Sequence, residues 1–184
     1  MGSSSSTDKE KTGAEWTGCL HFHQGNGTWK KLESEEIIDY FRDKLEADEE
    51  KIIFAEIRKY DLGLVTAWFG HWHEYTLVET TNWFWTFEKN SKGIYVQRAK
   101  RNSDVRCWFA GVKRKKDRSE GRSSAVEFGE NALDAAHWII NRGELDKTYH
   151  WTESNCHFFA SLLYEAITGT AYPGGKQRRL HNTL

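Results

Sequence analysis

The sequence is short of proline and methionine, with one residue of each among 184, and it contains three cysteines. An odd number of cysteines cannot all pair with one another. The spacing of Cys19, Cys107 and Cys156 matches neither a disulfide framework nor a zinc motif. We therefore expect free thiols in a reducing, cytoplasmic compartment.

Long apolar runs are also absent. No stretch approaches the roughly 20 apolar residues that a membrane-spanning helix needs, and residues 1–11 lack the apolar core of a signal peptide. The net charge of −1 gives no bias toward nucleic acid or membrane. We expect residues 1–14, which are small and polar, to be a flexible leader and residues 15–184 to form a single domain.

Aromatic side chains are abundant: nine Trp, ten Phe and seven Tyr. Such wide side chains favour a sheet-based core. The turn signal at residues 25–27 predicts a short strand or a first hairpin within 16–29, and residues 71–80 and 83–89 predict a second hairpin. Residues 93–99 and 105–112 predict two more strands. The strongly basic segment 113–124 predicts a polar loop.

Three helices are predicted, over 34–47, 130–141 and 156–168. Ser34 is the expected cap of the first helix. Ser154 or Asn155 is the expected cap of the last, and Gly169 its end. Helices at both ends of an antiparallel strand run indicate an α+β domain, an antiparallel sheet packed with helices.

Cys156 stands at the start of the last predicted helix. The exposed N–H groups and the dipole of a helix N-terminus favour a thiolate, and the same N–H groups can hold an oxyanion. Phe159, Leu163 and Ile167 follow at helical spacing, so the thiol should point from the buried face toward the strands. The alternative is a buried structural thiol.

The segment 153–160, ESNCHFFA, resembles the Asn-Cys motif of the lecithin retinol acyltransferase-like family, circularly permuted relatives of the NlpC and papain-like thiol enzymes. The similarity covers roughly residues 70–168, including the order of a His strand, a hairpin, a polar stretch and the Cys helix. One departure is that His157 follows Cys156 directly, where acyltransferase members usually have an acid and then a His. The resemblance therefore supports the permuted papain-like fold more strongly than the lipid-modifying branch.

His71 and His73 share one side of the first strand of the second hairpin, and either one is a candidate base. If the turn centres between Thr80 and Thr81, His73 lies opposite Glu88. The resemblance places a third polar residue on this second strand, so Glu88 is the candidate that orients His73. A register slip of two residues would favour His71 instead.

Other interpretations remain open for these residues. His71, His73 and Glu88 together are a conceivable zinc site, although no fourth ligand stands at a recognisable spacing. We predict no metal and no cofactor. His137, His150 and His157 are predicted to be capping, packing or rim residues.

The expected chemistry is acyl transfer by a Cys156–His73–Glu88 triad through an acyl-enzyme. The resemblance implies an acyl-bearing substrate, for an acyltransferase or phospholipase A, or else a peptidase or isopeptidase. The polar C-terminal segment 174–184 contrasts with the apolar anchor of many lipid-modifying members. A non-catalytic binding module is a further alternative. The basic segment 113–124 could contact a membrane surface transiently, and no nucleic acid partner is expected.

Overall fold

The computed structural model describes residues 15–25, 27–61, 72–109, 112–126, 129–150 and 152–170. The expected leader 1–14 lies outside the described residues, and so does His71. The described residues form a mixed α+β structure with a mostly antiparallel open sheet and few helices. None of the helices in these ranges is long and apolar enough to cross a bilayer.

The described part of the chain contains a seven-stranded sheet with the order β2-β1-β6-β5-β4-β3-β9. Neighbouring strands are antiparallel except β1 and β6, which pair in parallel. A separate hairpin consists of β7 and β8. The strands are β1 Leu20–Gln24, β2 Lys30–Leu32, β3 Ile52–Asp61, β4 Trp72–Thr80, β5 Phe84–Lys89, β6 Ile94–Ala99, β7 Trp108–Phe109, β8 Val112–Lys113 and β9 Lys115–Ala125.

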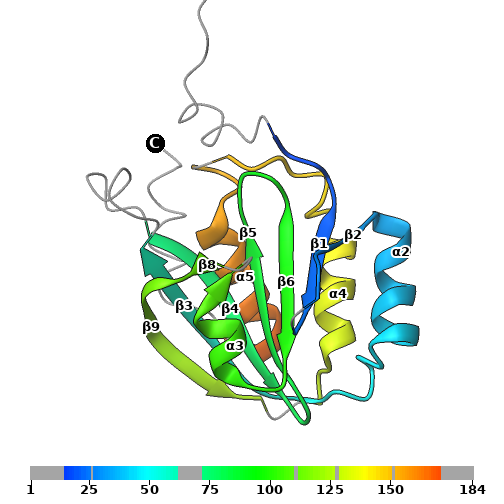
Figure 1. Cartoon of the computed structure of the whole chain (residues 1–184), viewed down its shortest axis with the longest axis horizontal. Helices are drawn as coiled ribbons and strands as arrows, with labels where there is room; N and C mark the ends of the chain where they lie inside the picture. The colour runs from blue at the N-terminus through cyan, green and yellow to red at the C-terminus, as the bar shows by residue number, and fades with distance from the viewer. Residues whose placement is uncertain are drawn as a thin grey trace, which may run out of the picture.

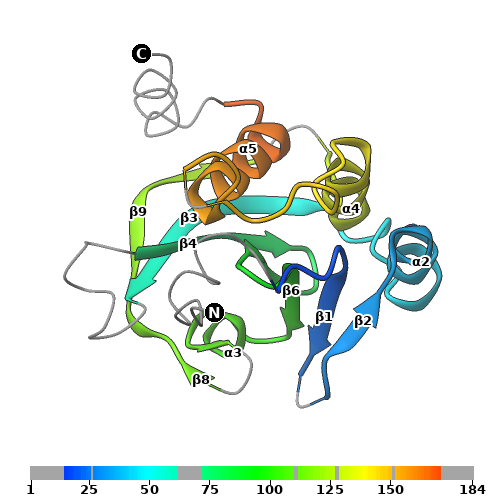
Figure 2. The same ribbon diagram turned by 90° about the horizontal axis from the view of Figure 1, so that it is seen from above.

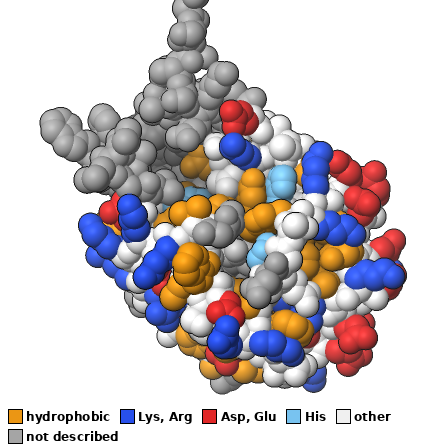
Figure 3. Space-filling model, viewed as in Figure 1, with side chains coloured by type: hydrophobic (Ala, Val, Ile, Leu, Met, Phe, Trp, Pro, Cys, Tyr) orange, Lys and Arg blue, Asp and Glu red, His pale blue; other side chains and the backbone are white. Residues whose placement is uncertain are grey.

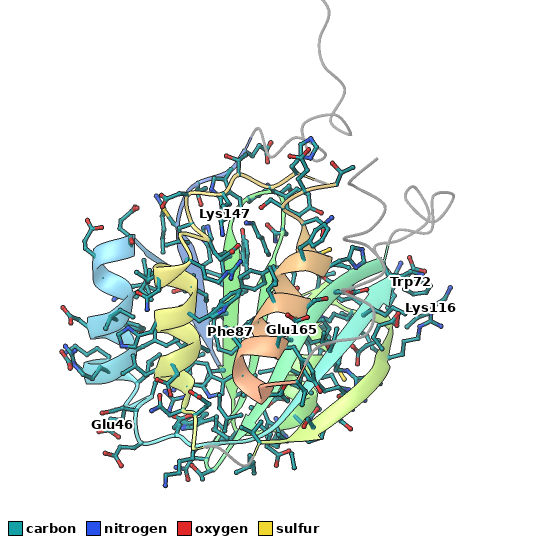
Figure 4. All side chains as sticks on the ribbon, turned by 180° about the vertical axis from the view of Figure 1, so that it is seen from behind. Glu46, Trp72, Phe87, Lys116, Lys147 and Glu165 are labelled. Atoms are coloured by element: carbon teal, nitrogen blue, oxygen red, sulfur yellow. The ribbon has the colours of Figure 1, made fainter. Side chains whose placement is uncertain are left out.

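Helices lie on both sides of this sheet. They are α2 Ser34–Asp39, the π-helix η1 Tyr40–Lys44, α3 Asn102–Arg106, α4 Ala132–Asn141 and α5 Cys156–Thr168. Helices α2, α4 and α5 cover one side, whereas α3 and the β7–β8 hairpin lie on the other (Figures 1 and 2). Seen from behind, α4 and α5 lie in front of the sheet with Phe87 labelled between them (Figure 4).

The two sides of the sheet have separate cores because successive strand residues point to opposite faces. On the helical face, Val78 and Phe87 belong to the large core that includes Leu163 of α5. On the other side, the hairpin face, Tyr75 and Leu77 belong to a small core with Tyr60, Ala99 and Val105. His73 shares the hairpin face by alternation along β4.

Helix α5 matches its predicted range, and α4 begins at Ala132 rather than at the predicted residue 130. The first predicted helix does not form as one α-helix. The predicted helix 34–47 is α2 followed by a π-helical turn, η1. The expected cap Ser34 is wrong, because Glu33 occupies that position. The Glu33 side chain accepts from the backbone of Glu36, whose carboxylate accepts from the Glu33 amide at 2.9 Å.

Two predictions in the middle of the chain also need correction. Residues 105–112 are not one strand, since α3 continues to Arg106 and buries Val105 before the hairpin begins. The segment 113–124 is not a loop, since β9 pairs along β3. Asp117 explains how so charged a segment joins a sheet: it binds the Arg58 guanidinium at 2.8 Å and the Tyr75 hydroxyl at 2.6 Å. Ion pairs and hydrogen bonds, rather than apolar contacts, hold the side chains of this strand.

Candidate active site

Cys156 is the first residue of α5, and its side chain is buried. Asn155 caps the helix: its Oδ1 accepts from the amides of His157 at 3.0 Å and Phe158 at 3.1 Å. The buried stripe that begins at Phe159 packs α5 on the sheet, where the Thr76 hydroxyl donates to the Ala160 carbonyl at 3.1 Å. The helix therefore holds the thiol at the edge of β4.

The same cap changes the expected oxyanion site. Two first-turn amides, those of His157 and Phe158, are occupied by the Asn155 side chain. The backbone amide of Cys156 is the remaining first-turn donor that points along the helix axis. An oxyanion formed on a substrate would therefore have the Cys156 amide available to it, rather than a row of free helix amides.

His73 lies on β4 with its ring buried. Tyr60 is its backbone partner on β3, and the two rings pack with centroids 5.1 Å apart. The imidazole Nε2 is 3.2 Å from Glu88 Oε2, an ion-pair contact without the alignment of a linear hydrogen bond. The structure thus brings Cys156, His73 and Glu88 together, while His71 lies outside the described residues.

The hairpin that joins His73 to Glu88 has a different register from the one expected. The ladder pairs Glu79 with Phe84 and Thr76 with Phe87, so the turn centres between Thr81 and Asn82. Continuing this ladder places Glu88 opposite Tyr75, so Glu88 contacts His73 as a diagonal neighbour. The observed register thus differs by two residues from the expected one, and the change places Glu88 nearer Tyr75. Diagonal neighbours on one sheet face are close enough for such a contact.

Cys156 and His73 favour each other's charged forms. Burial opposes the Cys156 thiolate more than any other single effect. The charge and hydrogen bond of His73, the charge of His157 and the Glu74 amide outweigh it and lower the Cys156 pKa to about 6. Burial likewise opposes the imidazolium, yet the thiolate and Glu88 raise the His73 pKa to about 10. Between these values the pair is a thiolate and an imidazolium.

Glu88 is held by two further residues that the sequence analysis did not single out. Its Oε1 forms an ion pair with Arg114, and both side chains are fully buried. The Tyr60 hydroxyl donates to Oε2 at 3.3 Å. Burial alone would raise the Glu88 pKa, but the Arg114 charge and His73 lower it. Nothing in the charged run 113–118 distinguishes Arg114 from its neighbours, so only folding reveals its role.

His157, which was predicted to be a capping, packing or rim residue, lies beside the candidate site. Its Nδ1 is 2.6 Å from Oε1 of Glu74, whose side chain is buried. Each member of this pair is the chain neighbour of a candidate catalytic residue: Glu74 follows His73, and His157 follows Cys156. The pair lies on the helical face, and the charge of His157 is one of the effects that lower the Cys156 pKa.

A buried lysine supports the segment that leads into α5. Lys89 Nζ donates to Ser154 Oγ at 2.8 Å and lies 3.4 Å from Glu144 Oε2. The side chain of Lys89 is 1% exposed, and burial lowers its pKa despite the Glu144 charge. Lys89 follows Glu88 in β5 and points to the opposite face. One strand therefore carries both the contact to His73 and the support for the loop before Cys156.

The pocket found among the described residues lies away from the candidate catalytic residues. In the described ranges, no three His, Cys, Asp or Glu side chains gather as metal ligands. A pocket of about 590 Å³ lies at the C-terminal end of β6, between the β1–β2 hairpin and α3. Its lining includes Trp29, Ala99 and Trp108 but none of the three candidate catalytic residues. The candidate site is therefore the contact between Cys156 and His73.

Comparisons with family models, curated proteins and solved structures find no match to this chain. The resemblance to the lecithin retinol acyltransferase-like family therefore rests on the Asn-Cys motif and on the order of the elements.

Proposed function

We propose that this chain is a thiol-dependent acyltransferase or hydrolase of the lecithin retinol acyltransferase-like type, with a circularly permuted papain-like fold. The observation that carries the proposal is the buried contact between Cys156, at the tip of α5, and His73, on the adjacent strand. A helix N-terminal thiol beside a carboxylate-oriented imidazole is the arrangement that nucleophilic catalysis requires. Residues 15–184 would be the catalytic domain.

The proposed reaction has two half-reactions. His73 holds the Cys156 proton, and the thiolate attacks an ester, thioester or amide carbonyl. The leaving oxygen, sulfur or nitrogen takes the proton from the imidazolium as the carbonyl re-forms, leaving an acyl-enzyme. His73 then deprotonates water or an acceptor hydroxyl or amine. That nucleophile attacks the thioester, and the thiolate departs.

Glu88 and Arg114 support the base in this scheme. The Glu88 carboxylate stabilises the imidazolium that each half-reaction forms and uses. Arg114 keeps that carboxylate ionised inside the protein. The Tyr60 hydroxyl limits the positions that Glu88 can take. The three described cysteines are free, which suits the reducing, cytoplasmic compartment that we propose for the protein.

The test is covalent labelling followed by turnover. Wild type and the Cys156→Ala and His73→Asn variants are incubated with a thiol-directed acyl probe, and adducts are located by mass spectrometry. We expect rapid labelling at Cys156 that requires His73. Labelling at Cys19 or Cys107 with none at Cys156 would overturn the proposal. It would favour a non-catalytic binding module.

A second comparison separates the substrate classes. Phospholipid and peptide or isopeptide substrates are offered to the wild-type protein under identical conditions. Release of a fatty acid, or its transfer to an acceptor, supports the acyltransferase or phospholipase assignment. Cleavage of the amide substrates alone would replace it with the peptidase assignment, which uses the same three residues.

A further inference from the structure

The β7–β8 hairpin exposes apolar side chains that the candidate site does not use. Trp108 is 47% exposed and Val112 is 68% exposed. In the part of the chain that the structure describes, only Ile53 of β3 is a further large apolar side chain with comparable exposure, at 44%. The hairpin thus concentrates two of these three residues within five positions.

Basic side chains continue directly from this hairpin. Lys113, Lys115, Lys116 and Arg118 are all exposed. The labelled Lys116 lies at the outer edge of the sheet (Figure 4). On the hairpin face, basic and apolar side chains gather side by side over β8 and β9 (Figure 3). We call Trp108, Val112, Lys113, Lys115 and Lys116 the hairpin patch.

The charges that point inward from the same segment are neutralised. Arg114 pairs with Glu88, and Asp117 pairs with Arg58 and with Arg106 at 3.0 Å. Asp61 lies 3.3 Å from Lys116, whose side chain nevertheless stays 74% exposed. The hairpin patch therefore presents a net positive charge around apolar side chains.

The hairpin is held firmly at its base. Arg114 donates from its backbone to the Cys107 carbonyl at 2.8 Å and from its guanidinium to the Trp108 carbonyl at 2.9 Å. The Phe109 ring packs against Tyr95 at 5.3 Å. The backbone that carries the half-exposed Trp108 is therefore fixed by contacts from Arg114 and Phe109.

We propose that the hairpin patch docks the protein on an anionic lipid surface. Tryptophan prefers the membrane–water interface, and exposed lysines are attracted to anionic headgroups. Two exposed apolar side chains among lysines suit insertion between headgroups better than they suit a broad protein interface. Docking here would also bring lipid to the side of the sheet that carries His73 and Glu88.

This inference deepens the proposed function by naming the source of its acyl substrate, and in that respect it rests on the proposed function. The docking itself does not need catalysis. Binding is therefore measured with the Cys156→Ala protein, which cannot turn over lipid. Loss of docking and loss of the enzyme proposal are then separate results.

The experiment is co-sedimentation with phosphatidylcholine vesicles, with and without phosphatidylserine. We expect binding to the anionic vesicles that weakens with salt. The Lys113→Glu/Lys115→Glu protein should bind at least about tenfold more weakly, since each lysine near such a surface contributes roughly fivefold. Trp108→Ser and Val112→Ser should also weaken binding. If Trp108→Ser fails to fold, vesicle binding by Val112→Ser tests the same prediction.

Control variants that make the same kinds of change can be placed away from the hairpin patch. Ile53→Ser removes a comparably exposed apolar side chain, and Lys44→Glu/Lys51→Glu reverses two exposed lysines away from the hairpin. Both should bind vesicles like the parent protein. Equal losses in the hairpin and matched variants would overturn the proposal. Binding of an acidic polypeptide that ignores Trp108 and Val112, with no vesicle binding, would replace the lipid surface with a protein partner.

Discussion

The Glu88 carboxylate and the Arg114 guanidinium form an ion pair in which neither side chain is exposed to solvent. The pair lies between the base of the β7–β8 hairpin and the ring of His73. Glu88 is ionised in this buried place because Arg114 compensates its charge. The electrostatics of the candidate site therefore depend on a residue that touches neither Cys156 nor His73 in the described contacts.

Replacing Arg114 should destabilise the fold. In Arg114→Met, Glu88 becomes an uncompensated buried charge, and breaking such a pair costs about 3–5 kcal/mol. Urea unfolding measures the loss. The double variant Arg114→Met/Glu88→Gln should be more stable than Arg114→Met, because it removes the stranded charge. A loss below about 1 kcal/mol for the single variant would contradict the prediction.

The ionisation of Cys156 should be visible in the pH dependence of alkylation. Iodoacetamide reacts with the thiolate, so the rate at Cys156 should rise with pH through a midpoint of about 6. In His73→Asn the midpoint should move up, toward the ordinary thiol value of about 8.5 or above, since burial remains while the imidazolium is lost. Peptide mass spectrometry reads the rate. Cys19, hydrogen-bonded to Glu33 at 3.0 Å, is an internal control that should not respond.

The proposed activity should also fall at high pH, which gives the pH profile an upper limb. Turnover needs the thiolate and the imidazolium together, so kcat/KM should rise through about 6 and fall through about 10, where His73 loses its proton. Glu88→Gln removes a charge that raises the His73 pKa, so the upper limb should move to lower pH. The rate should fall by up to about 10⁴-fold, the effect of neutralising the third residue of a triad. Glu56→Gln, which affects a carboxylate paired with Arg58 at 2.8 Å, should leave the limb in place.

The helix caps offer a matched pair of variants. Asn155 caps α5, and Asn131 caps α4 by accepting from the Asp134 amide at 3.0 Å. Either change to Ala should cost about 1 kcal/mol of stability. Only Asn155→Ala should slow alkylation of Cys156, because it loosens the turn that carries the thiol. Equal alkylation in the two variants would show that the cap acts on stability alone.

The local features of the candidate site were predictable from the sequence. Helix α5 covers the predicted 156–168, Asn155 is one of its two predicted caps, and Gly169 ends it with φ +64°. These signals are short-range, since a cap and a left-handed glycine act within one turn. The hairpin of β4 and β5 was predictable for the same reason. Its register was not, because Thr80 bonds the Trp83 backbone across a longer turn and moves the centre by one residue.

The longer-range contacts were decided by the tertiary structure. No local pattern distinguishes Arg114 from the basic residues around it. Its role depends on β9 pairing with β3 and on the carbonyls of Val105 in α3 and Trp108 in β7, which accept from its guanidinium. Likewise, His157 meets Glu74 because α5 packs across β4. The sequence by itself determined which helix carries the thiol and which strand carries His73. Packing decided which charges surround them, because buried charges are paired by residues far apart in the chain.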